Sequence, residues 1–211
     1  SEVSEKEIIS KILELNARDE INGILVQLPL PNQNASNVIA EIDPLKDVDG
    51  FHKENLKHLR AGKPAIASAV ALGVMRLIRT AVNDNPLPEK AVIVSSPLFA
   101  EPLEILLREQ GVDMVVTQAE DSELAEKTKN ADILIVAEGI PGLITGPMVK
   151  QDAIVIDVGT TKVYGRLHGD VDFDSVAPVA SAITPVPGGV GPMTVAMLLV
   201  NILKAQQLQN G

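Results

Sequence analysis

Two loop segments of this chain hold polar residues that could do chemistry. In GILVQLPLP at 23–31, Gln27 is a lone amide at the end of an apolar stretch, and in PLKDVDGFH at 44–52, Asp47 and Asp49 flank a valine. An ionised carboxylate only accepts hydrogen bonds, so an aspartate in a cleft suits a ligand with two adjacent N–H donors, such as an aminopyrimidinone ring. Each segment also has a simpler interpretation. The amide satisfies nearby backbone, and both aspartates cap backbone groups of a solvated turn.

A third segment, TPVPGGVGPMT at 184–194, runs from a strand end through three glycines into a helix with Pro192 in its first turn. Backbone N–H groups at such a turn approach a ligand closely and offer it the positive end of the helix dipole. Many turns of this kind bind nothing, so the signal is weak alone. The chain has no cysteine, and its histidines, at 52, 58 and 168, are scattered, so we predict no metal site.

The composition narrows the class of protein that must position these segments. The chain has 211 residues, enough for one large domain or two small ones with a buried core. Its net charge of −10 argues against nucleic acid or an anionic membrane surface as partner. No apolar run approaches the ~20 residues of a membrane helix, and no signal segment opens the chain. The absence of cysteine fits a reducing compartment. We therefore predict a cytoplasmic protein with a small-molecule ligand.

Hydrophobic periodicity predicts the elements that carry the three segments. Short apolar strands alternate with amphipathic helices from residue 90 onward, which indicates a parallel sheet covered on both faces. The predicted fold class is a doubly wound, Rossmann-like α/β sheet with a smaller α/β domain. Strands are expected at 24–28, 92–94, 114–117, 133–136, 154–157 and 180–183. Helices are expected at 4–17, 36–42, 65–82, 101–109, 122–128 and 193–206, and a hairpin at 163–173.

In this order, with an α/β domain between the last two, the three segments together resemble the bifunctional methylenetetrahydrofolate dehydrogenase/methenyltetrahydrofolate cyclohydrolase family. ADILIVAEGIPGLI at 131–144 and AIVIDVG at 153–159 also resemble the nucleotide-domain strands of that family. The resemblance implies hydride transfer from the methylene bridge of a tetrahydrofolate derivative to NADP or NAD, followed by hydrolysis of the methenyl cation. It also implies a homodimer.

The resemblance assigns roles to particular residues. It places Gln27 and Asp49 in the folate pocket as catalytic and substrate-binding residues, and Pro187, Gly188, Gly189 and Val190 in the same cleft near the nicotinamide. For the dinucleotide it implies Ser95, Ser96, Ala137, Gly139, Asp157 and Gly159.

The resemblance also implies a domain division. Residues 1–64 would form the folate-binding domain, 65–187 the Rossmann-like NAD(P)-binding domain, and 188–211 a C-terminal helix that returns to the first domain. The segment 63–65 would begin the long helix that connects the two domains.

One departure from the family concerns the proton-handling residues. The catalytic lysine of the family and its companion tyrosine lie upstream of the part of the family that this chain matches. Four lysines of the first domain, at 46, 53, 57 and 63, are read more simply as solvated surface cations. We expect any cyclohydrolase activity to depend on residues outside these 211, or to be lost.

The second departure is in the cofactor loop. The family carries a Gly-Arg-Ser turn where this chain has AVIVSSPLFAEP at 91–102, with Ser95 and Ser96 in the turn. Glycine lets the backbone approach a pyrophosphate, and arginine accommodates a 2′-phosphate. Glu101 adds a negative charge, and Glu120-Asp121 replaces a His-Ser pair of the family. We predict a degraded dinucleotide site, which leaves NADP and NAD both open.

Two rival functions follow from these departures. The chain is either a non-catalytic folate-binding or partner-binding homologue that has lost the cofactor turn and the lysine, or a scaffold that binds no folate. Equilibrium binding of folate and dinucleotide distinguishes both rivals from the enzyme.

Overall fold

The structure is a computed structural model that describes residues 3–28 and 30–210. It divides into two compact units, called unit 1 and unit 2 below. Unit 1 comprises Ser1–Ala69 and Val195–Gly211, and unit 2 comprises Val70–Thr194. The boundaries between the units fall within two long helices, α4 (Ala69–Ala81) and α8 (Val190–Asn210). No helix in the described ranges is long and apolar enough to cross a membrane.

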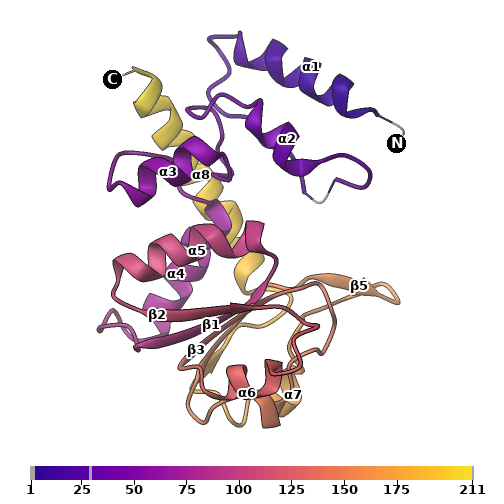
Figure 1. The fold of residues 1–211 in the computed structure, drawn as a ribbon, viewed down its shortest axis with the longest axis vertical. Coiled ribbons are helices and arrows are strands. Elements are labelled where there is room, and N and C mark those ends of the chain that lie inside the picture. The colour runs from indigo at the N-terminus through magenta and orange to yellow at the C-terminus, as the bar shows by residue number, and fades with distance from the viewer. Residues whose placement is uncertain (1–2, 29, 211) are drawn as a thin grey trace. The chain divides into compact units, whose positions relative to one another are not determined.

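Unit 2 is built on a five-stranded parallel sheet with strand order β2-β1-β3-β4-β7 (Figure 1). The sheet order places β1 in contact with both β2 and β3, so the chain reverses direction across the sheet after β2. The strands are β1 (Lys90–Ser95), β2 (Asp113–Thr117), β3 (Ile133–Ala137), β4 (Ile154–Asp157) and β7 (Ala182–Ile183).

Helices cover both faces of this sheet, so two hydrophobic cores form. Ile93 and Ile135 pack on one face with α4 and α5 (Pro97–Glu109). Val94 and Leu134 point to the other face, which α6 (Leu124–Lys129) and α7 (Phe173–Val176) cover (Figure 1). Continuous apolar strands are the expected consequence of burial on both faces. The doubly wound α/β class predicted from the sequence is confirmed.

Three features of unit 2 differ from the prediction. β2 is an edge strand, and Val115 remains 45% exposed, so this strand is not buried throughout. The helix predicted from residue 101 begins at Pro97, because proline is well tolerated in the first helical turn. The hairpin spans β5 (Thr161–Val163) and β6 (Arg166–His168) rather than 163–173. Tyr164 and Gly165, with φ of 47° and 82°, form its turn, as two-residue hairpin loops require. The 3₁₀ turn η1 (Gly146–Met148) lies between β3 and β4.

Unit 1 contains α1 (Glu5–Asn16), α2 (Ala35–Ala40), α3 (Lys53–Arg60) and most of α8. A reciprocal capping box between Ser4 and Glu7 begins α1, as the sequence predicts. The Asn201 side-chain amide of α8 donates to the carbonyls of Val48 and Ala67, at 2.8 Å each. These two bonds anchor α8 to the segments that flank α3.

Unit 1 also departs from the prediction. The strand expected at 24–28 is reduced to one parallel bridge between Ile24 and Asp47. The helix expected from 65, with its start at 63–65, begins only at Ala69. The residues before it are extended because their N–H groups bond elsewhere: that of Ile66 donates to the Asn55 side chain. The final helix is longer than predicted, and α3 was not predicted.

Candidate functional site

Asp47 and Asp49 lie in the same loop, but their carboxyl groups differ in burial and in hydrogen bonding. Asp47 is 1% exposed, and its carboxylate accepts the N–H groups of Gly50 and His52 at 3.1 and 2.8 Å. Gly50 has a φ of +79°, and a Cβ there would lie 2.4 Å from the Ala67 carbonyl carbon. Asp47 is therefore a capping residue that holds a tight turn, which is the simpler of its two interpretations.

Asp49 is half-buried, and its backbone carbonyl accepts the N–H of Ala69 at 3.1 Å. Burial raises the pKa of the Asp49 carboxyl to about 6, and the negative charge of Asp47 acts in the same direction. The ionised carboxylate is therefore poorly solvated where it stands. A ligand with paired N–H donors would relieve this cost by hydrogen-bonding the charged form.

Gln27 lies on the segment that pairs with the aspartate loop. Ile24 donates to the Lys46 carbonyl at 2.6 Å and accepts from Val48 at 3.4 Å, so the two segments run parallel from this bridge. Gln27 and Asp49 both follow the bridge within a few residues, toward the same end. The Gln27 side chain is exposed and donates to the neighbouring Leu28 carbonyl at 3.1 Å. The structure thus brings the two backbone segments together, but the Gln27 amide is hydrogen-bonded to the backbone of its own segment.

Lys46 corrects one prediction from the sequence. It is only 6% exposed, and its ammonium donates to the carbonyls of Asn16 and Arg18 at 2.7 and 2.9 Å. Lys46 is therefore a structural cation that joins the end of α1 to the aspartate loop, and it is not a solvated one. The lysines at 53, 57 and 63 are exposed, as predicted.

The four residues of the glycine-rich segment that were predicted to line the ligand site differ in their exposure to solvent. Pro187 and Gly188 are exposed, whereas Gly189 and Val190 are buried. Gly188 has a φ of +109°, and a Cβ on Gly189 would lie 2.6 Å from the Pro185 carbonyl oxygen. Only the first two residues present their backbone to solvent, and the other two pack the start of α8.

The turn between β1 and α5 lies where dinucleotides bind in doubly wound sheets. Ser95 and Ala137 are register partners at the carboxyl ends of β1 and β3, where the strand order reverses. Ser95 is buried, and its hydroxyl donates to the Ser96 carbonyl at 3.2 Å. Ser96 is exposed at the N-cap of the 13-residue α5 without a side-chain capping bond. Its hydroxyl and the N-terminus of this helix are donors of the kind that bind phosphate groups.

The other predicted cofactor residues belong to a buried polar network. The Asp157 carboxylate accepts the N–H groups of Gly159 and Asp170, at 3.0 Å each, and burial raises its pKa to about 6. Asp170 in turn accepts the N–H groups of Glu138 and Gly139, at 2.6 and 2.9 Å. A Cβ on Gly159 would lie 2.2 Å from the Asp170 carboxyl carbon. Asp157, Gly159 and Gly139 therefore shape the loops that follow β3 and β4.

Sequence reasoning missed two carboxylates of this network, Glu138 and Asp170. Glu138 sits between the end of an apolar strand and Gly139, and an acidic residue at that place was a signal that could have found it. Asp170 carries no local signal, because its role depends on how the chain returns after the hairpin. Burial raises the pKa of Glu138, and the charges of Glu120 and Asp170 act in the same direction, whereas the nearby Ala119 backbone N–H opposes the rise.

A separate cavity of about 430 Å³ opens beside the hairpin in unit 2. Pro141, His168, Phe173 and Val186 line it together with Asp157, which is the only predicted site residue among its lining residues. Within the described ranges no group of three histidine, aspartate or glutamate side chains is placed to hold a metal ion.

A parallel sheet with its order reversed at β1 and a helix terminus at that point are typical of dinucleotide-binding proteins, and this chain adds a second, largely helical unit. The family model for the NAD(P)-binding domain of tetrahydrofolate dehydrogenase/cyclohydrolase matches residues 68–210, and that for the catalytic domain matches residues 1–49. The chain belongs to the tetrahydrofolate dehydrogenase/cyclohydrolase family, as its sequence motifs predict.

Individual relatives agree with this assignment. The bifunctional protein FolD of Desulfovibrio desulfuricans is 46% identical over 211 residues, which cover 97% of this chain and 74% of the relative. A bifunctional FolD crystal structure from Campylobacter jejuni has a TM-score of 0.89 at 38% identity and covers 99% of this chain and 75% of that one. The Trypanosoma brucei enzyme, complexed with NADP and an inhibitor, has a TM-score of 0.89 at 35% identity, with 99% and 74% coverage.

Proposed function

We propose that this chain binds a reduced folate in unit 1 and NAD(P) in unit 2, for the methylenetetrahydrofolate dehydrogenase and methenyltetrahydrofolate cyclohydrolase reactions. One contrast carries the folate assignment. The Asp47 carboxylate is occupied by two backbone N–H groups of its own turn, whereas Asp49 is half-buried and its carboxyl has a pKa raised to about 6. A carboxylate kept in such a place suits the adjacent N–H donors of a pterin ring.

The roles of the other residues follow from their positions. Gln27 follows the same β-bridge as Asp49. Its side-chain amide, which donates to the Leu28 carbonyl, can donate instead to a polar group of the folate. In unit 2, Ser96 and the N-terminus of α5 would hold the pyrophosphate, and exposed Pro187 and Gly188 would line the site. NAD(P)⁺, when bound, supplies the hydride acceptor. The chain binds and orients the reactants, which is the proximity contribution to the rate.

The hydrolytic half of the reaction needs a group that handles the proton of water. Among the lysines of unit 1, Lys46 is occupied by two carbonyls, and Lys57 pairs with Glu54 at 3.1 Å on the surface. We therefore propose that cyclohydrolase activity depends on residues outside these 211, or is lost. Spectrophotometric assay of the purified chain tests this. Robust turnover of methenyltetrahydrofolate by the 211-residue chain alone would refute it.

Equilibrium binding tests the proposal as a whole. Calorimetric titration of the chain with tetrahydrofolate, and separately with NAD⁺ and NADP⁺, distinguishes three functions. Binding of folate and of at least one dinucleotide supports the enzyme. Binding of folate alone supports a folate-binding homologue, which the missing glycines of the β1–α5 turn favour as the second candidate. Binding of neither ligand supports a scaffold and contradicts the proposal.

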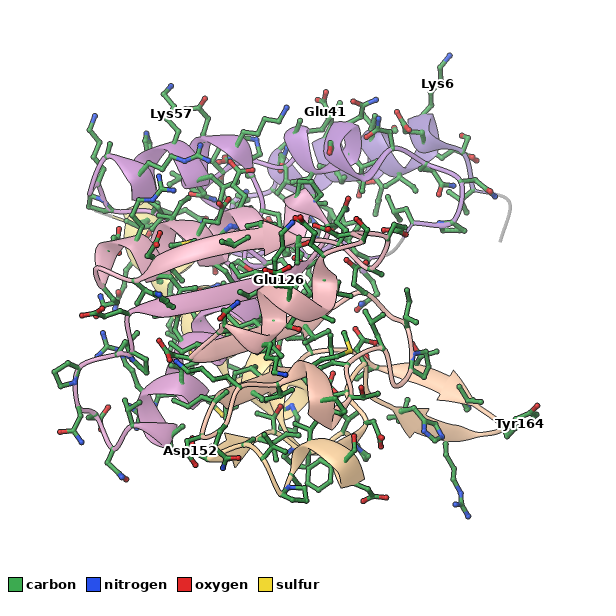
Figure 2. The ribbon with its side chains drawn as sticks, turned by 60° about the horizontal axis from the view of Figure 1, so that its bottom comes forward. Lys6, Glu41, Lys57, Glu126, Asp152 and Tyr164 are labelled. Carbon is green, nitrogen blue, oxygen red and sulfur yellow. The ribbon has the colours of Figure 1, made fainter. Side chains whose placement is uncertain are left out.

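We further propose that the chain forms a homodimer. The hairpin exposes Tyr164 fully and Leu167 to 45%, and Figure 2 shows Tyr164 at the hairpin tip, away from the sheet. Large apolar side chains exposed on a protruding hairpin agree with an interaction surface there. Light scattering after size exclusion should give the mass of a dimer, and Leu167→Asp should shift it toward the monomer. A monomeric mass for the unaltered chain would contradict this. A cytoplasmic location is part of the same proposal and agrees with the cysteine-free composition.

A further inference from the structure

We infer that this chain selects NAD over NADP, and that the Glu138 carboxylate is the specificity-determining group that disfavours the adenosine 2′-phosphate. The inference rests on the proposed function, since it concerns the dinucleotide site of unit 2.

Glu138 spans the dinucleotide crevice. It follows β3, and the Ala119 backbone N–H, which follows β2, lies close enough to its carboxylate to lower its pKa, against the larger opposite effect of burial. Because β1 lies between β2 and β3 in the sheet, this contact crosses the carboxyl end of β1, where Ser96 begins α5. In doubly wound sheets the dinucleotide binds in the crevice at this point of reversal. The Glu138 side chain therefore lies in the path of the cofactor.

Glu138 keeps one oxygen without a protein partner. Its Oε1 is buried and accepts no hydrogen bond within the described part of the chain. A buried, unsatisfied carboxylate oxygen is costly and is relieved when a ligand donates to it. A ribose hydroxyl is such a donor, whereas a phosphate ester at the same position only accepts. An acidic side chain that binds the ribose 2′-hydroxyl is the general device by which dinucleotide domains choose NAD.

The neighbouring charges at the end of β2 are also negative. Glu120 is exposed in the β2–α6 loop, and Asp121 is fixed by Thr117 Oγ1 and Lys127 Nζ, at 2.6 Å each. Lys127 also pairs with Glu123 at 3.3 Å, so its charge is already shared between two carboxylates. Dense negative charge opposes a phosphate monoester that carries nearly two further negative charges at neutral pH.

The backbone donors at the end of β3 are also unavailable. The N–H groups of Glu138 and Gly139 both donate to the buried Asp170 carboxylate, at 2.6 and 2.9 Å. Consecutive N–H groups in a loop of this kind often bind a phosphate. Here an internal carboxylate takes that place, so the loop offers a 2′-phosphate no compensation for the charge of Glu138.

Equilibrium binding of NAD⁺ and NADP⁺ to the 211-residue chain tests the inference without turnover. The unaltered chain should bind NAD⁺ at least about tenfold more tightly than NADP⁺. Glu138→Gln keeps an oxygen acceptor near Ala119 and removes the charge, so it should reduce this ratio by about tenfold. Glu126→Gln, on the exposed surface of α6 (Figure 2), is the matched control and should leave the ratio unchanged. Raising the ionic strength should narrow the ratio in the unaltered chain, because salt screens the repulsion.

Three results would overturn the inference. They are equal or tighter binding of NADP⁺ by the unaltered chain, an unchanged ratio in folded Glu138→Gln, and a control that changes the ratio as much. Should Glu138→Gln fail to fold by circular dichroism, exposed Glu120→Gln should still narrow the ratio, by less than tenfold. Failure of both nucleotides to bind contradicts the proposed function itself, whereas tighter NADP⁺ binding contradicts only the choice of cofactor.

Discussion

Replacing Asp49 with asparagine should make the folded chain more stable at neutral pH. The pKa of Asp49 is raised from 3.8 to about 6 in the folded state, chiefly by burial. This difference corresponds to about 3 kcal/mol of unfavourable free energy for the ionised form. Because the side chain is only partly buried, solvent screening reduces the expected gain in Asp49→Asn to about 1–2 kcal/mol.

The sign of the effect with pH follows from linkage. Between pH 3.8 and about 6 the folded state holds more protons than the unfolded state, so the stability of the unaltered chain falls as the pH rises. The loss is complete above about pH 6 and absent below about pH 4. Asp49→Asn should therefore exceed the unaltered chain in stability at pH 7 and match it near pH 4.

Urea denaturation followed by circular dichroism, at pH 7 and at pH 4, measures this difference. Asp19→Asn serves as the control, because Asp19 is an exposed aspartate of the same unit and its replacement should change the unfolding free energy by less than about 0.5 kcal/mol. A variant at 49 that is less stable than the unaltered chain at pH 7 would refute the reasoning, since it would show that the carboxylate is well satisfied in the fold. So would a gain of equal size at both pH values.

Two further substitutions test the supports of the site. Lys46→Met should lower the free energy of unfolding by about 1–3 kcal/mol, because the partly buried carbonyls of Asn16 and Arg18 lose their donor. A thermal or urea midpoint equal to that of the unaltered chain would contradict this. Gly159→Ala should destabilise the chain by about 2–3 kcal/mol, because the added methyl group would clash with the fully buried Asp170 carboxylate. Calorimetry measures this loss. An unchanged unfolding temperature would contradict the prediction, since it would show that the loop moves to accommodate the methyl group.

The sequence predicted the architecture of unit 2 well because its signals are local and repeated. Strands such as β1 and β3 are apolar at successive positions, and this pattern identifies a parallel sheet buried on both faces. The combination of three specific loop segments, in order, identified the family. The segment 24–28 has the same apolar character but forms only a bridge, because strand formation depends on a partner that the pattern does not reveal.

The chemistry of single side chains was less accessible to the sequence. Asp47 and Asp49 are one residue apart and identical in type, yet one caps a turn and the other keeps a perturbed carboxylate. Lys46 was read as solvated because lysine usually is, and its two carbonyl partners come from residues far back in the chain. Burial and long-range hydrogen bonds decide these roles, and neither follows from residue type and spacing.

The most direct measurement of the central claim is the dissociation constant of tetrahydrofolate for three forms of the chain at pH 7: unaltered, Asp49→Asn and the exposed control Asp19→Asn. Loss of a charged acceptor for paired N–H donors should weaken binding by about 10- to 100-fold in Asp49→Asn alone, even though that variant is the more stable protein. Equal affinities for all three forms would contradict the assignment of Asp49 as the residue that holds the folate.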